Sequence, residues 1–286
     1  MSRLSVPKTY KLFIGGAFPR SESGRTYEVT SPASAFLANA AQASRKDARD
    51  AVVAARSAFP AWAGATSYNR GQVLYRIAEV LEGRRAQFID EIAQNEGVSV
   101  SAAAAQVDES IDLWVWYAGW ADKFVQVAGN ANPVSGPFFN LSVPEPTGVV
   151  AIVAPQSSSL LGFVSAVAPA LTAGNAVVVI ASEQFPLSAI SLSEVFATSD
   201  VPGGVINVLT GSPAEIAPWL ASHADVNALD LVGAGGIEWV DLQIAAAETL
   251  KRVLPPANGD DQVAYSLDRI VALTETKTVW HTKSML

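Results

Sequence analysis

Small polar residues, prolines and glycines form four turns that each follow an apolar run of the chain. These turns are residues 155–159, 182–183, 210–211 and 233–236. In an open parallel sheet the carboxyl ends of the strands meet at one edge, and ligands bind in the crevice outside it. The backbone N–H groups of a glycine-rich turn before a helix can face a phosphate. A carboxylate can accept hydrogen bonds from ribose hydroxyls. The candidate nucleotide-binding residues are therefore Pro155, Ser157, Glu183, Gly211, Gly233 and Ala234.

Each candidate also has a structural interpretation. Residues 233–236 read Gly-Ala-Gly-Gly, which is not the Gly-x-Gly-x-x-Gly pattern, and glycines serve any tight strand-to-helix turn. Glu183 could equally be a carboxylate that a helix dipole stabilises. Serines 157–159 need a base to act as nucleophiles, and no motif ties a histidine to them, so we interpret them as N-cap residues. His223 is interpreted as a partner of a helix C-terminus.

The composition limits the chemistry further. The 286 residues contain no cysteine and only two histidines, His223 and His281. Disulfides, thiolate ligands and a cysteine nucleophile are excluded, and a multi-histidine metal site is not expected. The net charge of -8 argues against nucleic acid and against an anionic membrane surface as partners. The first residues lack the apolar core of a signal peptide, so a cytoplasmic protein is the expectation.

The segment 147–183 predicts the element that positions the candidate turns. Two β-branched apolar runs, 147–154 and 176–181, flank a stretch with helical spacing. Runs that are apolar on both faces are typical of parallel strands with helices on each side. No charge occurs between Glu145 and Glu183, but Pro155, Pro169 and Gly174 interrupt the run where a βαβ unit turns, which disfavours a membrane span.

The remaining elements follow from periodicity and turn signals. Before this unit we predict strands at 10–16 and 27–30, helices at 44–60, 69–95 and 101–125, and an edge arm at 138–146. After it the alternation continues with helices at 187–197, 213–222 and 237–249 and strands at 205–209, 228–232 and 252–254. The fold class is α/β, a doubly wound sheet of about five parallel strands. Residues 270–281 are a β-prone segment that needs a sheet edge in this subunit or another.

At these residues the chain resembles the aldehyde dehydrogenase superfamily, over nearly its whole length. The stretches that carry the resemblance occur in the family's order: 74–82, 146–150, 169–179, 182–189, 201–211, 250–253 and 274–280. The last of these resembles the family's C-terminal oligomerisation strand. The resemblance implies a Rossmann-like domain over residues 1–257, which includes the edge arm, and a C-terminal oligomerisation arm over residues 258–286.

The departures from the family pattern concern its functional residues. Ser157 stands where the family has the oxyanion-stabilising asparagine, and Ile180 where it has a lysine for the adenosine ribose. Ala234 replaces a phosphate-facing serine, and Pro256 occupies the place of the general base. The catalytic domain with its cysteine nucleophile is expected to be absent. This pattern is similar to the second, degenerate half of class-16 aldehyde dehydrogenases, which packs against a full catalytic unit.

The sequence therefore favours a catalytically inactive aldehyde-dehydrogenase-like protein that acts as a structural or regulatory oligomerisation module. Thiohemiacetal chemistry needs a thiolate, an oxyanion donor and a base. Two alternatives remain: a regulator that binds NAD or NADP without chemistry, and a subunit that is active only in complex with a catalytic aldehyde dehydrogenase. Its expected partners are a second copy or such a catalytic subunit, bound through 138–146 and 270–281.

Overall fold

A five-stranded parallel sheet forms the centre of the protein. The computed structural model describes residues 6–256 and 265–283. The strand order is β7 (Ile206–Leu209), β6 (Ala176–Ile180), β5 (Val149–Val153), β8 (Ala228–Asp230) and β9 (Arg252–Leu254), and all neighbours are parallel. Every residue of β5 and β6 is buried, as runs without polar alternation require. The predicted βαβ unit and the predicted α/β fold class are confirmed.

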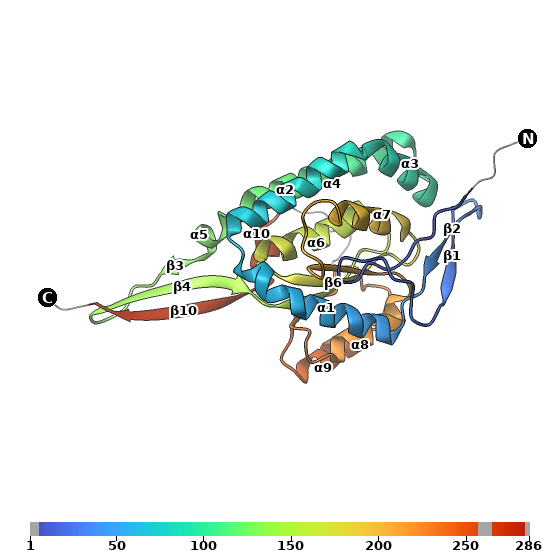
Figure 1. Ribbon diagram of the computed structural model, residues 1–286. Coiled ribbons are helices and arrows are strands. Elements are labelled where there is room, and N and C mark those ends of the chain that lie inside the picture. Colours follow the sequence, from blue (N-terminus) through green and yellow to red (C-terminus); the bar gives the residue numbers. More distant parts are fainter. Residues whose placement is uncertain (1–5, 257–264, 284–286) are drawn as a thin grey trace, which may run out of the picture.

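Helices cover both faces of this sheet (Figure 1). Alternate residues of β5 point to opposite faces, so Val150 and Ile152 join one hydrophobic cluster and Val149 and Val153 join the other. The first cluster contains α6 (Leu161–Ala173), α7 (Leu187–Phe196), α2 (Ser67–Gly83), α3 (Arg85–Glu96) and α4 (Val100–Trp120). The second contains α1 (Arg45–Gly64), α8 (Pro213–Ser222) and α9 (Trp239–Ala247).

The single helix predicted over 69–95 is wrong, because the chain leaves the helical conformation at Arg84. This residue has φ −109° and ψ 9°, and it separates α2 from α3. Its guanidinium lies 2.6 Å from a carboxylate oxygen of Glu194 on α7. A tertiary ion pair of this kind is invisible to local periodicity. The capping box predicted at the start of α1 is confirmed, with Ser44 and Asp47 in the reciprocal positions.

The predicted N-terminal strands are only partly correct. Residues 27–30 belong to β1 (Thr26–Thr30), which pairs with β2 (Phe36–Ala41), a strand that the sequence did not predict. The segment 10–16 forms no continuous strand: Tyr10 bridges to Ala40 and Phe13 bridges to Val208. The segment divides its pairing between two sheets and therefore joins β1 and β2 to the edge of the central sheet.

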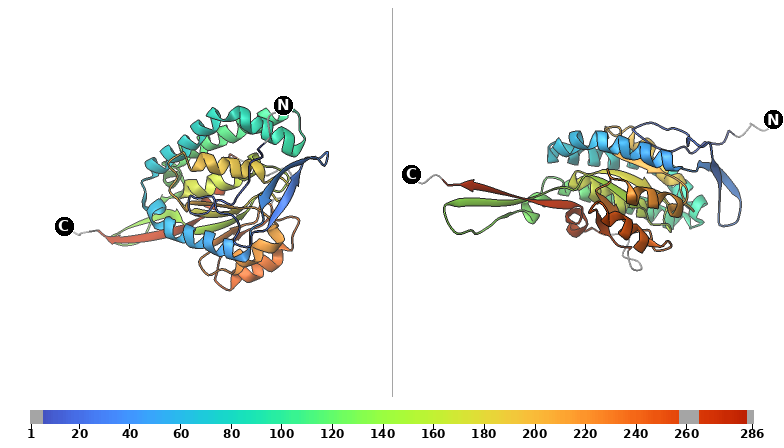
Figure 2. Two further views of the ribbon diagram at one scale, coloured as in Figure 1. Left: turned by 45° about the vertical axis from the view of Figure 1, so that its right-hand side comes forward. Right: turned by 90° about the horizontal axis from the view of Figure 1, so that it is seen from below.

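An extended arm projects from the body of the molecule (Figures 1 and 2). It consists of β10 (Thr274–Thr282), β4 (Phe138–Pro146) and β3 (Asn130–Ala131), in the order β10-β4-β3. β4 and β10 are antiparallel over the full length of both strands. The strand predicted over 270–281 begins only at Thr274, because the residues before it form α10 (Leu267–Val271). A short helix, α5 (Phe124–Ala128), leads from α4 into the arm.

Candidate functional site

Three of the predicted turns, 155–159, 182–183 and 233–236, meet in one cleft at the carboxyl edge of the sheet. The cleft has a volume of about 360 Å³ and is lined by Gln156, Glu183, Gln184, Pro213, Gly233, Gly236 and Ile237. The structure thus brings Glu183 and Gly233 together, as the rule for parallel sheets requires. The other candidates, Pro155, Ser157, Gly211 and Ala234, lie outside the lining of this cleft.

Gln156 organises the mouth of the cleft, and the sequence interpretation missed it. Its side-chain nitrogen donates to the carbonyl of Ala154 at 2.7 Å, and its side-chain oxygen accepts the N–H of Glu183 at 2.9 Å. The hydroxyl of Ser182 donates to the Gln156 carbonyl at 2.8 Å. The amide therefore ties the turn after β5 to the turn after β6, and it places a neutral polar group in the cleft.

Glu183 follows β6 and is exposed, so its carboxylate is available to a ligand. The side chain of Tyr27, on β1, lies close to it. Burial, with a smaller contribution from the Glu183 carboxylate, raises the pKa of the Tyr27 phenol well above its usual value. Tyr27 therefore stays neutral at physiological pH and keeps its hydroxyl proton beside the site.

The turn after β8 offers fewer phosphate donors than its glycines suggest. The Gly233 N–H donates to Val153 O at 2.9 Å, and the Ala234 N–H donates to Leu231 O at 2.8 Å. A Cβ on Gly233 would lie 1.9 Å from the carbonyl oxygen of Ala154, so this glycine permits a close backbone contact. Within the described chain the N–H groups of Gly235 and Gly236 donate to no protein acceptor, and they remain for a ligand.

The other candidate residues have structural surroundings. Gly211 has φ +122°, and a Cβ there would contact Ala43 N at 3.3 Å. Pro155 is buried and packs against Gly162 in the first turn of α6. Ser157 is exposed, and the neighbouring Ser158 accepts the N–H of Gly162 at 3.0 Å. The N-cap residue of α6 is Leu160, which makes no side-chain cap hydrogen bond, so the interpretation of serines 157–159 as N-cap residues is wrong.

A second groove continues from the cleft. It lies between α8 and α9, has a volume of about 520 Å³ and shares Gly236 and Ile237 with the cleft. Ala214, Pro218 and Leu242 give it apolar walls, and Glu238 and Asp241 add two carboxylates to the lining. Because neither hollow contains a lysine, arginine or histidine in its lining, the site suits an uncharged group that can donate hydrogen bonds to carboxylates better than a free phosphate.

Residues 6–256 and 265–283 offer neither a membrane span nor a metal centre. Every helix in this part of the chain is too short or too polar to cross a lipid bilayer. In the same residues, no three histidine, aspartate or glutamate side chains gather as a group that could hold a metal ion.

Comparisons with known proteins agree with the resemblance seen in the sequence. The profile described as "Aldehyde dehydrogenase family" matches residues 18–263. "Aldehyde dehydrogenase, cytosolic 1" of Elephantulus edwardii is 32% identical over 248 residues, which are 85% of this chain and 49% of the relative. "Omega-crystallin" of Enteroctopus dofleini is 31% identical over 249 residues, or 86% of this chain and 50% of that protein.

Solved structures give the same result for the fold. HpcC from Thermus thermophilus superposes with a TM-score of 0.80 at 30% identity, over 87% of this chain and 48% of that one. The NAD+ complex of aldehyde dehydrogenase from Bacillus cereus gives 0.79 at 29% identity, over 86% and 50%. The chain spans about half the length of the relatives it matches. With a family profile and relatives that cover most of its length, the chain belongs to the aldehyde dehydrogenase family.

Proposed function

We propose that this chain is a catalytically inactive aldehyde-dehydrogenase-like protein that serves as a structural or regulatory oligomerisation subunit. The chain contains no cysteine, so it has no thiol to attack an aldehyde. Ser157 and Pro256 occupy the places of the family's oxyanion asparagine and general base. Covalent aldehyde oxidation requires all three groups. A chain without them contributes surface and architecture rather than chemistry.

The arm carries the proposal. Among the strands that the structure describes, β10 pairs only with β4, so its other edge has no strand partner in residues 6–256 and 265–283. Large apolar side chains on the arm are open to solvent, with Phe139 45% and Trp280 58% exposed. A projecting strand pair with a free edge and exposed aromatic side chains is suited to contact another chain. The proposed partner is a second copy or a catalytic aldehyde dehydrogenase subunit.

Two measurements test this function. Light scattering on the full chain should give a mass above the 30.0 kDa of one chain, alone or with a catalytic aldehyde dehydrogenase. Deletion of residues 274–286 should return the mass to that of the monomer, with the helical circular dichroism retained because the central sheet does not include β10. A dehydrogenase assay with several aldehydes and NAD or NADP should give no turnover, and robust turnover by the pure chain would refute the proposal.

A second candidate function is a regulator that binds NAD or NADP without chemistry. The continuous cleft and groove favour it, since they place the Glu183 carboxylate next to an apolar slot. These residues fit a nucleoside. They fit the diphosphate poorly, because the Gly233 and Ala234 N–H groups are already bonded and no cation lies in the lining. In the described turn after β8, the Gly235 and Gly236 N–H groups are left for phosphate oxygens.

Calorimetric titration tests this second candidate. Binding of NAD that weakens in Glu183→Gln but not in Glu82→Gln would support the regulator, since Glu82 is exposed on α2 and lies outside the cleft. No heat at millimolar NAD or NADP would end this alternative. The oligomerisation proposal does not depend on that result.

A further inference from the structure

A separate hollow lies on the opposite side of α8 from the groove described above. It has a volume of about 260 Å³ and lies between the first turns of α1 and the C-terminal end of α8. Arg45 and Arg49 contribute to its lining from α1, and Trp219, Ser222 and His223 contribute from α8 and its cap. The lining contains no aspartate or glutamate, although the chain as a whole has a net charge of -8.

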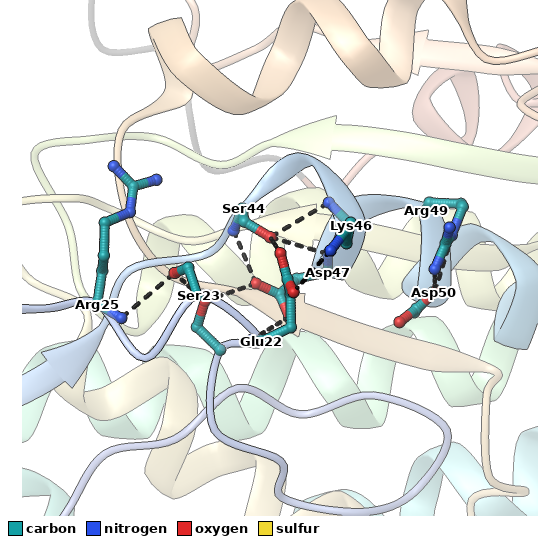
Figure 3. A network of polar contacts seen from close by, with 9 residues as sticks. Glu22, Ser23, Arg25, Ser44, Lys46, Asp47, Arg49 and Asp50 are labelled. Carbon is teal, nitrogen blue, oxygen red and sulfur yellow. Dashed lines mark hydrogen bonds and ion pairs between the residues drawn. The ribbon is translucent and has the colours of Figure 1, made fainter.

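Arg45 is the unusual cation of this surface. Its neighbours each have a carboxylate partner, two of which Figure 3 shows: Lys46 lies 3.1 Å from Glu22, and Arg49 lies 2.8 Å from Asp50. Among the described residues no carboxylate pairs with Arg45. Its guanidinium instead lies over the ring of Trp219, 4.0 Å from the centroid. The stacked ring holds the guanidinium in place and leaves its N–H edges for another acceptor.

The histidine of the hollow is also oriented as a donor. His223 Nδ1 accepts the backbone N–H of Asp225 at 3.2 Å. The neutral ring therefore carries its proton on Nε2. The hydroxyl of Ser222 donates to Pro218 O at 3.0 Å and is thereby held at the end of the helix. The hollow thus combines guanidinium and imidazole donors with no side-chain carboxylate acceptor.

We propose that this hollow binds a small organic phosphate through its phosphate group. A guanidinium edge such as that of Arg45 forms paired, charge-assisted hydrogen bonds with phosphate oxygens. The Nε2–H of His223 can donate to a further oxygen of the same phosphate group. The hollow has a volume of about 260 Å³, whereas one water molecule takes about 30 Å³ of the liquid. The hollow therefore has room for a ligand of several heavy atoms. Ala48 and Leu220 line the remaining space, where an organic group finds apolar contact. The site is independent of the arm and of the carboxyl-edge cleft.

The test uses the full chain, with inorganic phosphate and glycerol 3-phosphate as probes in calorimetry and in NMR titration of the Trp219 indole N–H. Glycerol 3-phosphate should bind more tightly than inorganic phosphate, and both should shift the Trp219 signal. Arg45→Gln should weaken binding by at least about tenfold, as expected for loss of a charge-assisted hydrogen bond. Lys46→Gln removes the same charge from the same helical turn but lies outside the lining, and it should change binding by less than about twofold.

Three results would overturn the assignment. The first is no shift of the Trp219 signal at millimolar concentrations of either probe. The second is equal weakening in Arg45→Gln and Lys46→Gln, which would mean diffuse charge attraction rather than a site. The third is equal affinity for the two probes, which would contradict an organic phosphate as the ligand. Arg45 is exposed, so the variant should fold, and its circular dichroism provides the control.

Discussion

The side-chain nitrogen of Asn175 donates a hydrogen bond to the backbone carbonyl of Leu273 at 2.9 Å. Asn175 follows the end of α6, and Leu273 immediately precedes β10. The same amide accepts the N–H of Gly148 at 2.9 Å and donates to Ala170 O at 3.1 Å. One fully buried side chain therefore connects the start of β5, the end of α6 and the root of the arm.

Replacement of Asn175 by alanine should lower the free energy of unfolding by about 3 kcal/mol, since it leaves several buried backbone groups without partners. Hydrogen exchange should also speed up at the root of β10. Urea denaturation gives the first quantity and exchange mass spectrometry gives the second. Asn69→Ala is the control, because Asn69 is exposed on α2, and it should change stability by less than about 0.5 kcal/mol. Equal effects of the two variants would show that the network does not stabilise the fold.

Substitution by alanine should lower the stability of the protein at Gly233 but leave it almost unchanged at Gly235. A Cβ on Gly233 would lie 1.9 Å from Ala154 O, whereas a Cβ on Gly235 has no heavy atom within 4 Å. Gly233→Ala should therefore destabilise the protein by about 1–3 kcal/mol or more, and Gly235→Ala should be nearly neutral. Thermal unfolding of both variants measures the difference. A neutral Gly233→Ala would mean that the turn after β8 is not packed against β5.

The two faces of the arm should contribute differently to assembly. In the β4/β10 pair, Val279 lies opposite Leu141, while Thr276 lies opposite Pro144 on the other face. If the proposed interface uses the face that carries Leu141, Val279 and Phe139, Val279→Lys should reduce the mass in light scattering to 30.0 kDa, because a lysine there would be buried in the contact without a partner. Thr276→Lys, on the same strand, should leave the mass unchanged. The opposite result would assign the interface to the face that carries Thr276 and Trp280.

Stability should decrease at alkaline pH, and Tyr117 should account for part of the decrease. Burial raises the pKa of Tyr117 to about 12, whereas a tyrosine in the unfolded chain has a pKa of about 10. In the folded state the Tyr117 phenol therefore stays protonated to a higher pH than in the unfolded state. This contribution is complete below about pH 10 and is lost as the pH rises toward about 12, with a slope of up to about 1.4 kcal/mol per pH unit.

Tyr117→Phe should make the dependence of unfolding free energy on pH shallower in this window. Some slope should remain, because burial also raises the pKa of Tyr10 and of Tyr27. Tyr68→Phe is the matched control, since the Tyr68 side chain is 64% exposed. Urea titrations across the alkaline range give the slopes. An identical slope in the wild-type protein and in Tyr117→Phe would contradict this assignment.

The central sheet could be predicted from the sequence because its signals are local. Short runs rich in β-branched residues, such as 176–180, favour a strand. Gly174 marks the end of α6, where it has φ +98°. The break at Arg84 was not predicted from periodicity, which continues through Gly83, and Arg84 makes its ion pair with a residue 110 positions away. β2 was missed for a similar reason. Its sequence, FLANAA, has weak β-propensity and becomes a strand by pairing with β1.

The candidate site shows the same division. Strand ends at one edge of a parallel sheet had to meet, so the proximity of Glu183 and Gly233 could be predicted. The use of the Gly233 N–H by Val153 and the bridging role of Gln156 depend on backbone positions that only the folded chain defines. Whether Pro155, Ser157, Gly211 and Ala234 take part in binding stays a prediction. The stacking of Arg45 on Trp219 joins two helices that lie far apart in the sequence, and no sequence motif predicts this contact.

The pairing of β4 with β10 also sets a time order for biosynthesis. Glu145 on β4 and Lys277 on β10, which form a diagonal ion pair at 3.0 Å, are separated by 132 positions in the chain. At a translation rate of about 5–20 residues per second, β4 leaves the ribosome on the order of ten seconds before the strand that completes it. During that interval the βαβ core can already form, while the edge of β4 that later pairs with β10 is open. Phe139 then lacks its cross-strand neighbour His281. A nascent chain in this state is exposed to aggregation and to chaperones, and any assembly that uses the paired arm must wait until β10 has been synthesised.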